Sequence, residues 1–240
     1  MEDTQKIDLL IESLRHPEKK VIRQAAERLI AMAPQVPELA SKLNRLLTIT
    51  PNQYRWPIAY VLAQISAPSP PCLEVLKETL GSGDSDIRWA AAVLLVRLGN
   101  ADKGVTASLR DLLRTGTPTQ RRMAVYCLRD IDQDEASLEA LLESLHDPDP
   151  LVRVAAVTSL KVHSRIGKER LDLLLRLFQE DPDPRVRRSA ALALARLGPF
   201  SDEIRLALNK AALSQDPYLR KAAQAALDLL QKKGPAPTDK

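Results

Sequence analysis

A pattern that recurs every 32 to 34 residues constrains the fold of this chain more than any other feature of its sequence. The clearest copies begin with Asp-Pro at Asp149, Asp183 and Asp216, and each carries an arginine four residues after the aspartate. The seven anchor arginines of the pattern are Arg23, Arg55, Arg88, Arg121, Arg153, Arg187 and Arg220. Alanine or isoleucine follows each of them at three residues, and leucine or isoleucine at seven. Self-similarity at this period predicts a repeat architecture.

Each repeat is predicted to form two helices joined by a turn. In the first helix, leucines recur on one face, as at Leu138, Leu141, Leu142 and Leu145. In the turn, Pro148 ends this helix, Asp149 offers a side-chain acceptor to the free amides of the second helix, and Pro150 takes its first position.

The turn pattern weakens toward the N-terminus. The expected caps of the second helices are Asp84, Thr117, Asp149, Asp183 and Asp216. In the first repeat, Lys19 occupies the cap position instead of an acid. In the second repeat, Pro57 falls in the first turn of the helix, where it is tolerated but is expected to delay the start of the helix.

Composition agrees with a chain made only of helices. Apolar residues make up 45% of the sequence but aromatic residues only 3%, which favours helices packed through small side chains over a sheet. Cys72 and Cys127 lie inside apolar helical patterns and are expected to be buried, reduced thiols.

The sequence contains no motif of a known chemistry. Nucleotide-binding, zinc-protease and hydrolase signatures are missing, and the three histidines are not spaced as metal ligands. We therefore predict no enzymatic activity, no metal and no cofactor. The chain opens with charged residues and has no apolar run of about 18 residues, so we expect a cytoplasmic protein without a signal peptide or membrane span.

The unit Asp-Pro-x-Val-Arg-x-x-Ala-x-x-x-Leu resembles the HEAT repeat, in the bacterial variety called HEAT-like. The resemblance implies an all-α fold, a right-handed α-solenoid of about seven helix-turn-helix repeats whose second helices line a concave face. It also implies that the repeated arginines and aspartates form a structural ladder between repeats. We expect residues 1–231 to form one array, and the polar, proline-bearing residues 232–240 to form a disordered tail.

The second helices also carry the residues that point to a function. At about 100° per residue, the positions one and five residues after the anchor arginine face away from the core. Both tryptophans and two of the four tyrosines occupy these outward positions, with arginines nearby. The candidate partner-binding residues are Trp56, Tyr60, Trp89, Val93, Arg97, Arg122, Tyr126 and Arg129. Tryptophan, tyrosine and arginine dominate the energetics of protein interfaces, although the rings could instead pack sideways against neighbouring second helices.

The leading hypothesis is a non-enzymatic protein-interaction scaffold whose groove binds a helix or extended segment of a partner, with acidic residues favoured. A first alternative, from the HEAT-like alkylpurine DNA glycosylases, is nucleic-acid binding. The net charge of only +4 and the lack of an acidic residue in the outward rows count against this alternative. A further alternative is a relative of the HEAT-like phycobilin lyases, whose groove would take a chromophore or a phycobiliprotein. That alternative rests on fold analogy alone.

Overall fold

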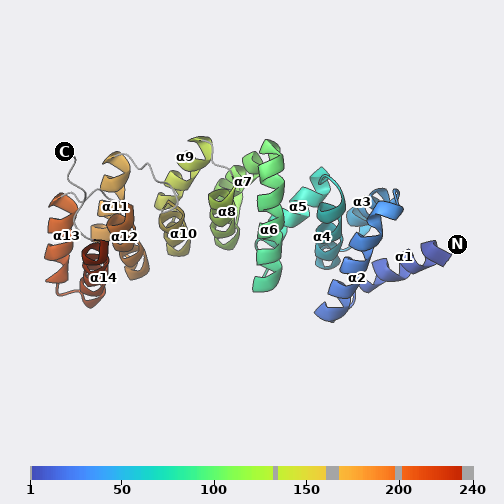
Figure 1. Cartoon of the computed structure of the whole chain (residues 1–240), viewed down its shortest axis with the longest axis horizontal. Helices are drawn as coiled ribbons and strands as arrows, with labels where there is room; N and C mark the ends of the chain where they lie inside the picture. Colours follow the sequence, from blue (N-terminus) through green and yellow to red (C-terminus); the bar gives the residue numbers. More distant parts are fainter. Residues whose placement is uncertain (1, 132–134, 161–167, 198–201, 234–240) are drawn as a thin grey trace. The chain divides into compact units, whose positions relative to one another are not determined.

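The computed structural model describes residues 2–131, 135–160, 168–197 and 202–233. Over these residues the chain forms fourteen α-helices and three short 3-10 helices, without a strand (Figure 1). The first helices of the seven pairs are α1 (Glu2–Ser13), α3 (Leu39–Ile49), α5 (Pro70–Thr79), α7 (Lys103–Thr115), α9 (Glu135–Glu143), α11 (Lys168–Glu180) and α13 (Asp202–Ala212).

Each second helix contains one of the anchor arginines. These helices are α2 (Lys19–Met32), α4 (Arg55–Ile65), α6 (Ser85–Ala101), α8 (Pro118–Asp130), α10 (Pro150–Leu160), α12 (Pro184–Leu197) and α14 (Pro217–Lys233). The 3-10 helices are η1 (Ala33–Gln35), η2 (Asn52–Tyr54) and η3 (Ser144–His146). The predicted all-α solenoid of seven helix pairs is therefore confirmed.

The chain divides into two compact units, Met1–Cys127 and Leu128–Lys240. In the first unit, α4 packs against its own partner α3 and against α2 and α6, the second helices of the adjacent pairs. In the second unit, α12 packs in the same way against α11, α10 and α14. Each pair therefore buries its apolar face with the help of its neighbours. The single array over residues 1–231 stays a prediction, and residues 234–240 of the expected tail lie outside the described residues.

Small side chains form the contact between second helices. The residue three positions after the anchor arginine is at most 3% exposed in every repeat. These residues are Ala26, Ile58, Ala91, Ala124, Ala156, Ala190 and Ala223. The residue seven positions after the arginine is buried in the five inner repeats, whereas Ile30 and Leu227 in the two end repeats are half-buried. An end repeat has only one neighbour, so it covers less of its own helix.

Both cysteines are buried and neither forms a disulfide, as the sequence predicted. Burial raises the pKa of Cys72 to about 12, so this thiol stays protonated at neutral pH.

The predicted side-chain caps are present at the starts of the second helices. Asp149 Oδ1 accepts hydrogen bonds from the amides of Leu151 at 2.8 Å and Val152 at 3.3 Å. Asp84 and Asp216 make the same two contacts in their own repeats. These bonds satisfy amides that have no partner inside the helix.

The first two repeats begin their second helices differently. In α2 the N-cap residue is Glu18 rather than Lys19, which the sequence placed at the cap; Lys19 is the first residue of the helix, and no side chain accepts a hydrogen bond at the N-cap. α4 begins at Arg55 itself, whereas α6 begins three residues before its arginine, Arg88. Pro57 therefore delays the start of α4, as predicted, and η2 fills the interval.

Most anchor arginines tie a second helix to its own turn. Arg153 Nη1 donates to the carbonyl of Asp147 at 2.8 Å, and Arg187 Nη1 donates to the carbonyl of Asp181 at 2.8 Å. Arg55, Arg88, Arg121 and Arg220 donate to a carbonyl five or six residues upstream. Arg153 also donates two hydrogen bonds of 2.8 Å to the Asp181 carboxylate of the next repeat, and Arg187 reaches Asp216 at 2.5 Å. The expected ladder is therefore present at these two steps of the C-terminal unit.

The cap of α12 gives a first prediction. Asp183 Oδ1 accepts a hydrogen bond from the Arg185 amide at 2.8 Å, and the Arg185 side chain holds the pKa of Asp183 at about 2. We expect Asp183→Ala to lower the free energy of unfolding by about 1 kcal/mol at neutral pH. Because the folded pKa lies below the ordinary value of 3.8, the cap stabilises fully above about pH 4, and its contribution is lost as the pH falls through about 2.

The measurement is urea unfolding of wild type and Asp183→Ala at several pH values. The difference between them should shrink on acidification. Asp202→Ala is the control, because Asp202 is almost fully exposed and its loss should leave the midpoint nearly unchanged. An unchanged midpoint for Asp183→Ala at neutral pH would contradict the cap.

The Arg153–Asp181 pair gives a second prediction. The Asp181 side chain is only 3% exposed and that of Arg153 only 11%, so a neutral partner would leave a desolvated guanidinium uncompensated. We expect Asp181→Asn to lower the free energy of unfolding by about 2–3 kcal/mol. Asp111→Asn, which removes an exposed pair with Arg114, should cost less than about 0.5 kcal/mol. Equal losses in the free energy of unfolding for the two variants, measured in urea, would show that the buried pair stabilises the fold no more than the exposed one.

Candidate functional site

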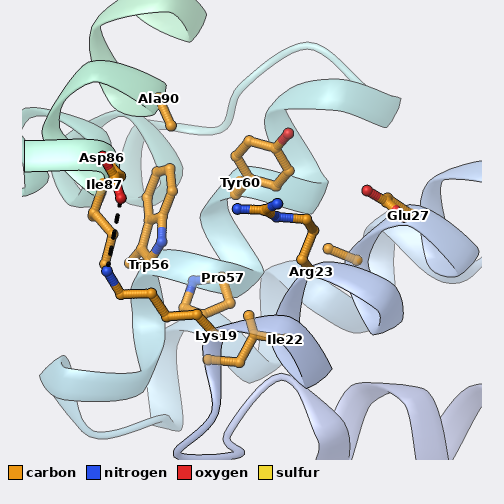
Figure 2. Close-up of a pocket in the computed structure, with 11 residues that line it drawn as sticks. Lys19, Ile22, Arg23, Glu27, Trp56, Pro57, Tyr60, Asp86, Ile87 and Ala90 are labelled. Atoms are coloured by element: carbon orange, nitrogen blue, oxygen red, sulfur yellow. Dashed lines mark ion pairs between the residues drawn. The ribbon is translucent and has the colours of Figure 1, made fainter.

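A cavity of about 430 Å³ opens between three second helices of the N-terminal unit (Figure 2). α4 contributes Trp56, Pro57 and Tyr60 to its wall, α2 contributes Arg23, and α6 contributes Asp86. Only second helices line it, so it lies on the face where the sequence predicted a groove. Its volume falls in the range of small-ligand sites, roughly 300–1,000 Å³.

The four predicted aromatic residues form two pairs. Trp56 and Tyr60 lie one turn apart on α4, with ring centroids 5.3 Å apart and ring planes tilted by 60°. Trp89 of α6 stacks on Tyr126 of α8 at 5.6 Å, with an angle of 23° between the planes. The first pair lines the cavity, and the second does not. Aromatic pairs with this spacing stabilise by about 0.5–1.5 kcal/mol beyond the burial of their surface.

The outward positions are at the surface. In none of the seven repeats is the residue one or five positions after the anchor arginine buried. Trp89 is 47% exposed and Val93 is 66% exposed, while Trp56, Tyr60 and Tyr126 are half-buried. Trp89 combines the two arrangements that the sequence left open. It packs sideways on the neighbouring second helix, and it still presents about half of its surface to solvent. The binding role of these residues stays a prediction.

The three predicted arginines have different surroundings. Arg97 Nη1 donates to the side chain of Gln64 at 2.5 Å and also reaches a backbone carbonyl of α4. Its partners are uncharged, so its positive charge is not compensated by them. Arg129 lies in the part of α8 that belongs to the C-terminal unit, and it donates to the Asp130 carboxylate at 2.6 and 2.7 Å. Arg122 is half-buried.

An ion pair joins the first repeat to the third beside the cavity. Lys19 Nζ contacts the Asp84 carboxylate and lies 3.9 Å from Asp86 Oδ2 (Figure 2 draws the contact with Asp86). The hydrogen bond raises the pKa of Lys19 and lowers the pKa of Asp84. The pair connects α2 to the start of α6 on the side of the cavity where Trp56 stands.

Sequence reasoning missed the charged part of this site. Lys19, Glu27 and Asp86 line the cavity, although none of them lies in the two outward rows. The one available signal was Lys19, which replaces the acidic cap of its repeat. Its carboxylate partners are two repeats away along the chain, so no local pattern pointed to them.

Within the described residues, no group of three or more His, Cys, Asp or Glu could hold a metal ion. None of the described helices combines the length and the apolar character that crossing a membrane requires.

The exposure of Trp89 gives a third prediction. Leu95, also on α6, is fully buried, so Leu95→Ala should lower the free energy of unfolding by about 2–5 kcal/mol. Trp89→Ala removes a half-exposed ring and its stacking on Tyr126, and should cost about 1 kcal/mol. Urea unfolding of the two variants compares them directly. A loss for Trp89→Ala as large as that for Leu95→Ala would mean that the ring is part of the core.

Two comparisons with known proteins concern the fold. The X-ray structure of the Escherichia coli protein YibA is similar with a TM-score of 0.54 and 16% sequence identity, covering 94% of this chain and 92% of that one. A designed armadillo repeat protein in complex with the peptide (KR)4 has a TM-score of 0.46 and 18% identity, covering 92% of this chain and 98% of the designed one. The first likeness supports the solenoid fold.

One relative matches by sequence. The "uncharacterized phycocyanin operon protein Z" of Pseudanabaena tenuis is 28% identical over 165 residues, which are 65% of this chain and 78% of that protein.

The family is shown by a match to a family model described as HEAT repeats. Two overlapping matches cover residues 106–195 and 138–228, just over half of the chain, and the cavity lies N-terminal to them. These matches agree with the helix pairs, the caps and the arginine contacts of the same region. The chain belongs to the HEAT repeat family.

Proposed function

We propose that this chain is a protein-interaction scaffold that binds a segment of a partner protein on the second-helix face of its N-terminal unit. The observation that carries the proposal is the stack of Trp89 on Tyr126, in which Trp89 is half-exposed. Like Trp56 and Tyr60 in the cavity wall, these two rings belong to second helices of the N-terminal unit. Large rings that are not needed in a core of alanine and leucine are typical anchors of an interface.

Each of the four rings already has a ring neighbour in the absence of a partner. Trp89 stacks on Tyr126, and Trp56 contacts Tyr60, so each ring is held in place before a partner arrives. A fixed ring loses little conformational freedom on binding, so more of its buried surface contributes to affinity. Arg97 adds a positive charge that its uncharged partners leave uncompensated, and this supports a partner with acidic residues.

The relative from Pseudanabaena tenuis supports a narrower second candidate. Its name places it in a phycocyanin operon, so a phycobiliprotein is the first partner class to examine. This candidate coincides with the phycobilin lyase-like alternative from the sequence. It requires that the 165 residues that match the relative include those that bind the phycobiliprotein.

Nucleic-acid binding has less support. The cavity wall contains the two acids Asp86 and Glu27 beside the two basic residues Lys19 and Arg23, so it has no excess of positive charge with which to follow a phosphate backbone. Lys19 is also already paired with Asp84 and Asp86.

Trp89→Ala tests the scaffold proposal. A tagged chain is used to capture proteins from the lysate of the source organism, and the captured proteins are quantified by mass spectrometry. At least one protein should be retained by wild type and depleted by about thirtyfold with Trp89→Ala, because truncation of an interface anchor costs about 2 kcal/mol. Leu206→Ala is the matched control, because Leu206 is an exposed apolar residue on a first helix of the other unit.

A capture profile that is the same for wild type and Trp89→Ala would contradict the scaffold proposal at this face. The narrower candidate is examined separately by calorimetry with purified phycocyanin. Binding that Trp89→Ala weakens and Leu206→Ala preserves would support it. The absence of binding would exclude phycocyanin as the partner, and the scaffold proposal would then be tested by the capture experiment alone.

A further inference from the structure

Arg23 differs from the other six anchor arginines. Each of the others donates a hydrogen bond to a backbone carbonyl of its own turn. The Arg23 guanidinium makes no hydrogen bond or ion pair with the described residues. Its side chain is exposed and reaches from α2 into the cavity, toward the side where Trp56 and Tyr60 stand (Figure 2).

Among the described residues, none of the other charged groups of the cavity forms an ion pair with Arg23. Asp86 faces Lys19 at 3.9 Å, and Asp84 is hydrogen-bonded to the same lysine. Glu27 follows Arg23 by one turn on α2 but forms no ion pair with it among the described contacts. The wall therefore contains one lysine that is paired with two carboxylates and one arginine that makes no hydrogen bond or ion pair with the described residues.

The rest of the wall is mainly apolar and includes two aromatic rings. Trp56, Tyr60 and Pro57 of α4 stand opposite α2, and Ile22 and Ile87 complete the wall from the two flanking helices. A guanidinium beside aromatic surface suits a carboxylate attached to an apolar group, because the fork of N–H donors takes the two oxygens while the rings cover the apolar part. The volume of about 430 Å³ suits a compact group of this kind rather than a whole helix.

We propose that this cavity is the specificity pocket of the scaffold, in which Arg23 binds an acidic side chain of the partner segment and Trp56 and Tyr60 bind an adjacent aromatic side chain. The inference rests on the proposed function and deepens it by naming the chemistry of the segment. It also assigns Arg23 a binding role in place of the structural role expected from its position in the repeat.

The test uses two peptides that differ only in one carboxylate, acetyl-Phe-Glu-Phe-amide and acetyl-Phe-Gln-Phe-amide. Binding is followed by NMR on the full chain, through the indole N–H signals of Trp56 and Trp89. The Glu peptide is expected to shift the Trp56 signal and to bind about fivefold more tightly than the Gln peptide, the upper end for a solvent-accessible ion pair.

Variants on α2 identify the group responsible. Arg23→Gln should make the two affinities equal, and Arg23→Lys should keep part of the preference, because lysine retains the charge but not the fork. Arg28→Gln is the matched control: it removes the same charge from an exposed position on α2 outside the cavity, and should keep the full preference. Circular dichroism confirms that the variants are folded.

Equal binding of the two peptides to wild type would overturn the inference. So would an unchanged preference in folded Arg23→Gln, or no shift of the Trp56 signal with either peptide. This readout uses only the isolated chain and synthetic peptides, so its failure leaves the Trp89-dependent capture of a partner intact. Conversely, a failed capture experiment leaves a measured carboxylate preference standing as a property of the cavity.

Discussion

The second helices can approach one another closely because alanine follows the anchor arginine at three residues in six of the seven repeats and is buried there. A single helix pair leaves this face open to water, so every repeat depends on the pair beside it. The close stacking also determines what lies outside the core. Residues one and five positions after the arginine are turned away from the packed face, and this places the aromatic rings at the surface.

Electrostatic contacts distinguish regular repeats from irregular ones. Where the turns carry Asp-Pro-Asp-Pro, as in the fifth and sixth repeats, the arginine joins its own turn to a carboxylate of the next repeat. In the first repeat Lys19 stands four residues before the anchor arginine, where the regular repeats carry an aspartate, and it pairs with the carboxylates at the start of α6. Arg23, unlike the other six anchor arginines, makes no hydrogen bond to its own turn among the described residues. The candidate site therefore arises where the repeat pattern is broken.

Part of this site could be predicted from the sequence. The helical period predicted that Trp56, Tyr60 and Trp89 point away from the core. The pairing of Trp89 with Tyr126 was not predictable, because the two rings come from different repeats and their distance depends on how two helices pack. The contact of Arg97 with Gln64 was not predictable for the same reason, because it also joins two different repeats.

The sequence by itself determined the number of repeats, because the pattern recurs every 32 to 34 residues. It also determined the caps and which helical positions face away from the core, because these depend on residues within one or two helical turns. The tertiary structure decided where a cavity opens, which rings meet, and which charges find partners. Such properties depend on distances between side chains that are remote in sequence, and a difference of a few ångströms decides between an ion pair and a free charge. Lys19 and Arg23 lie one turn apart on α2, and only the packing against α6 separates a paired lysine from an arginine open to a ligand.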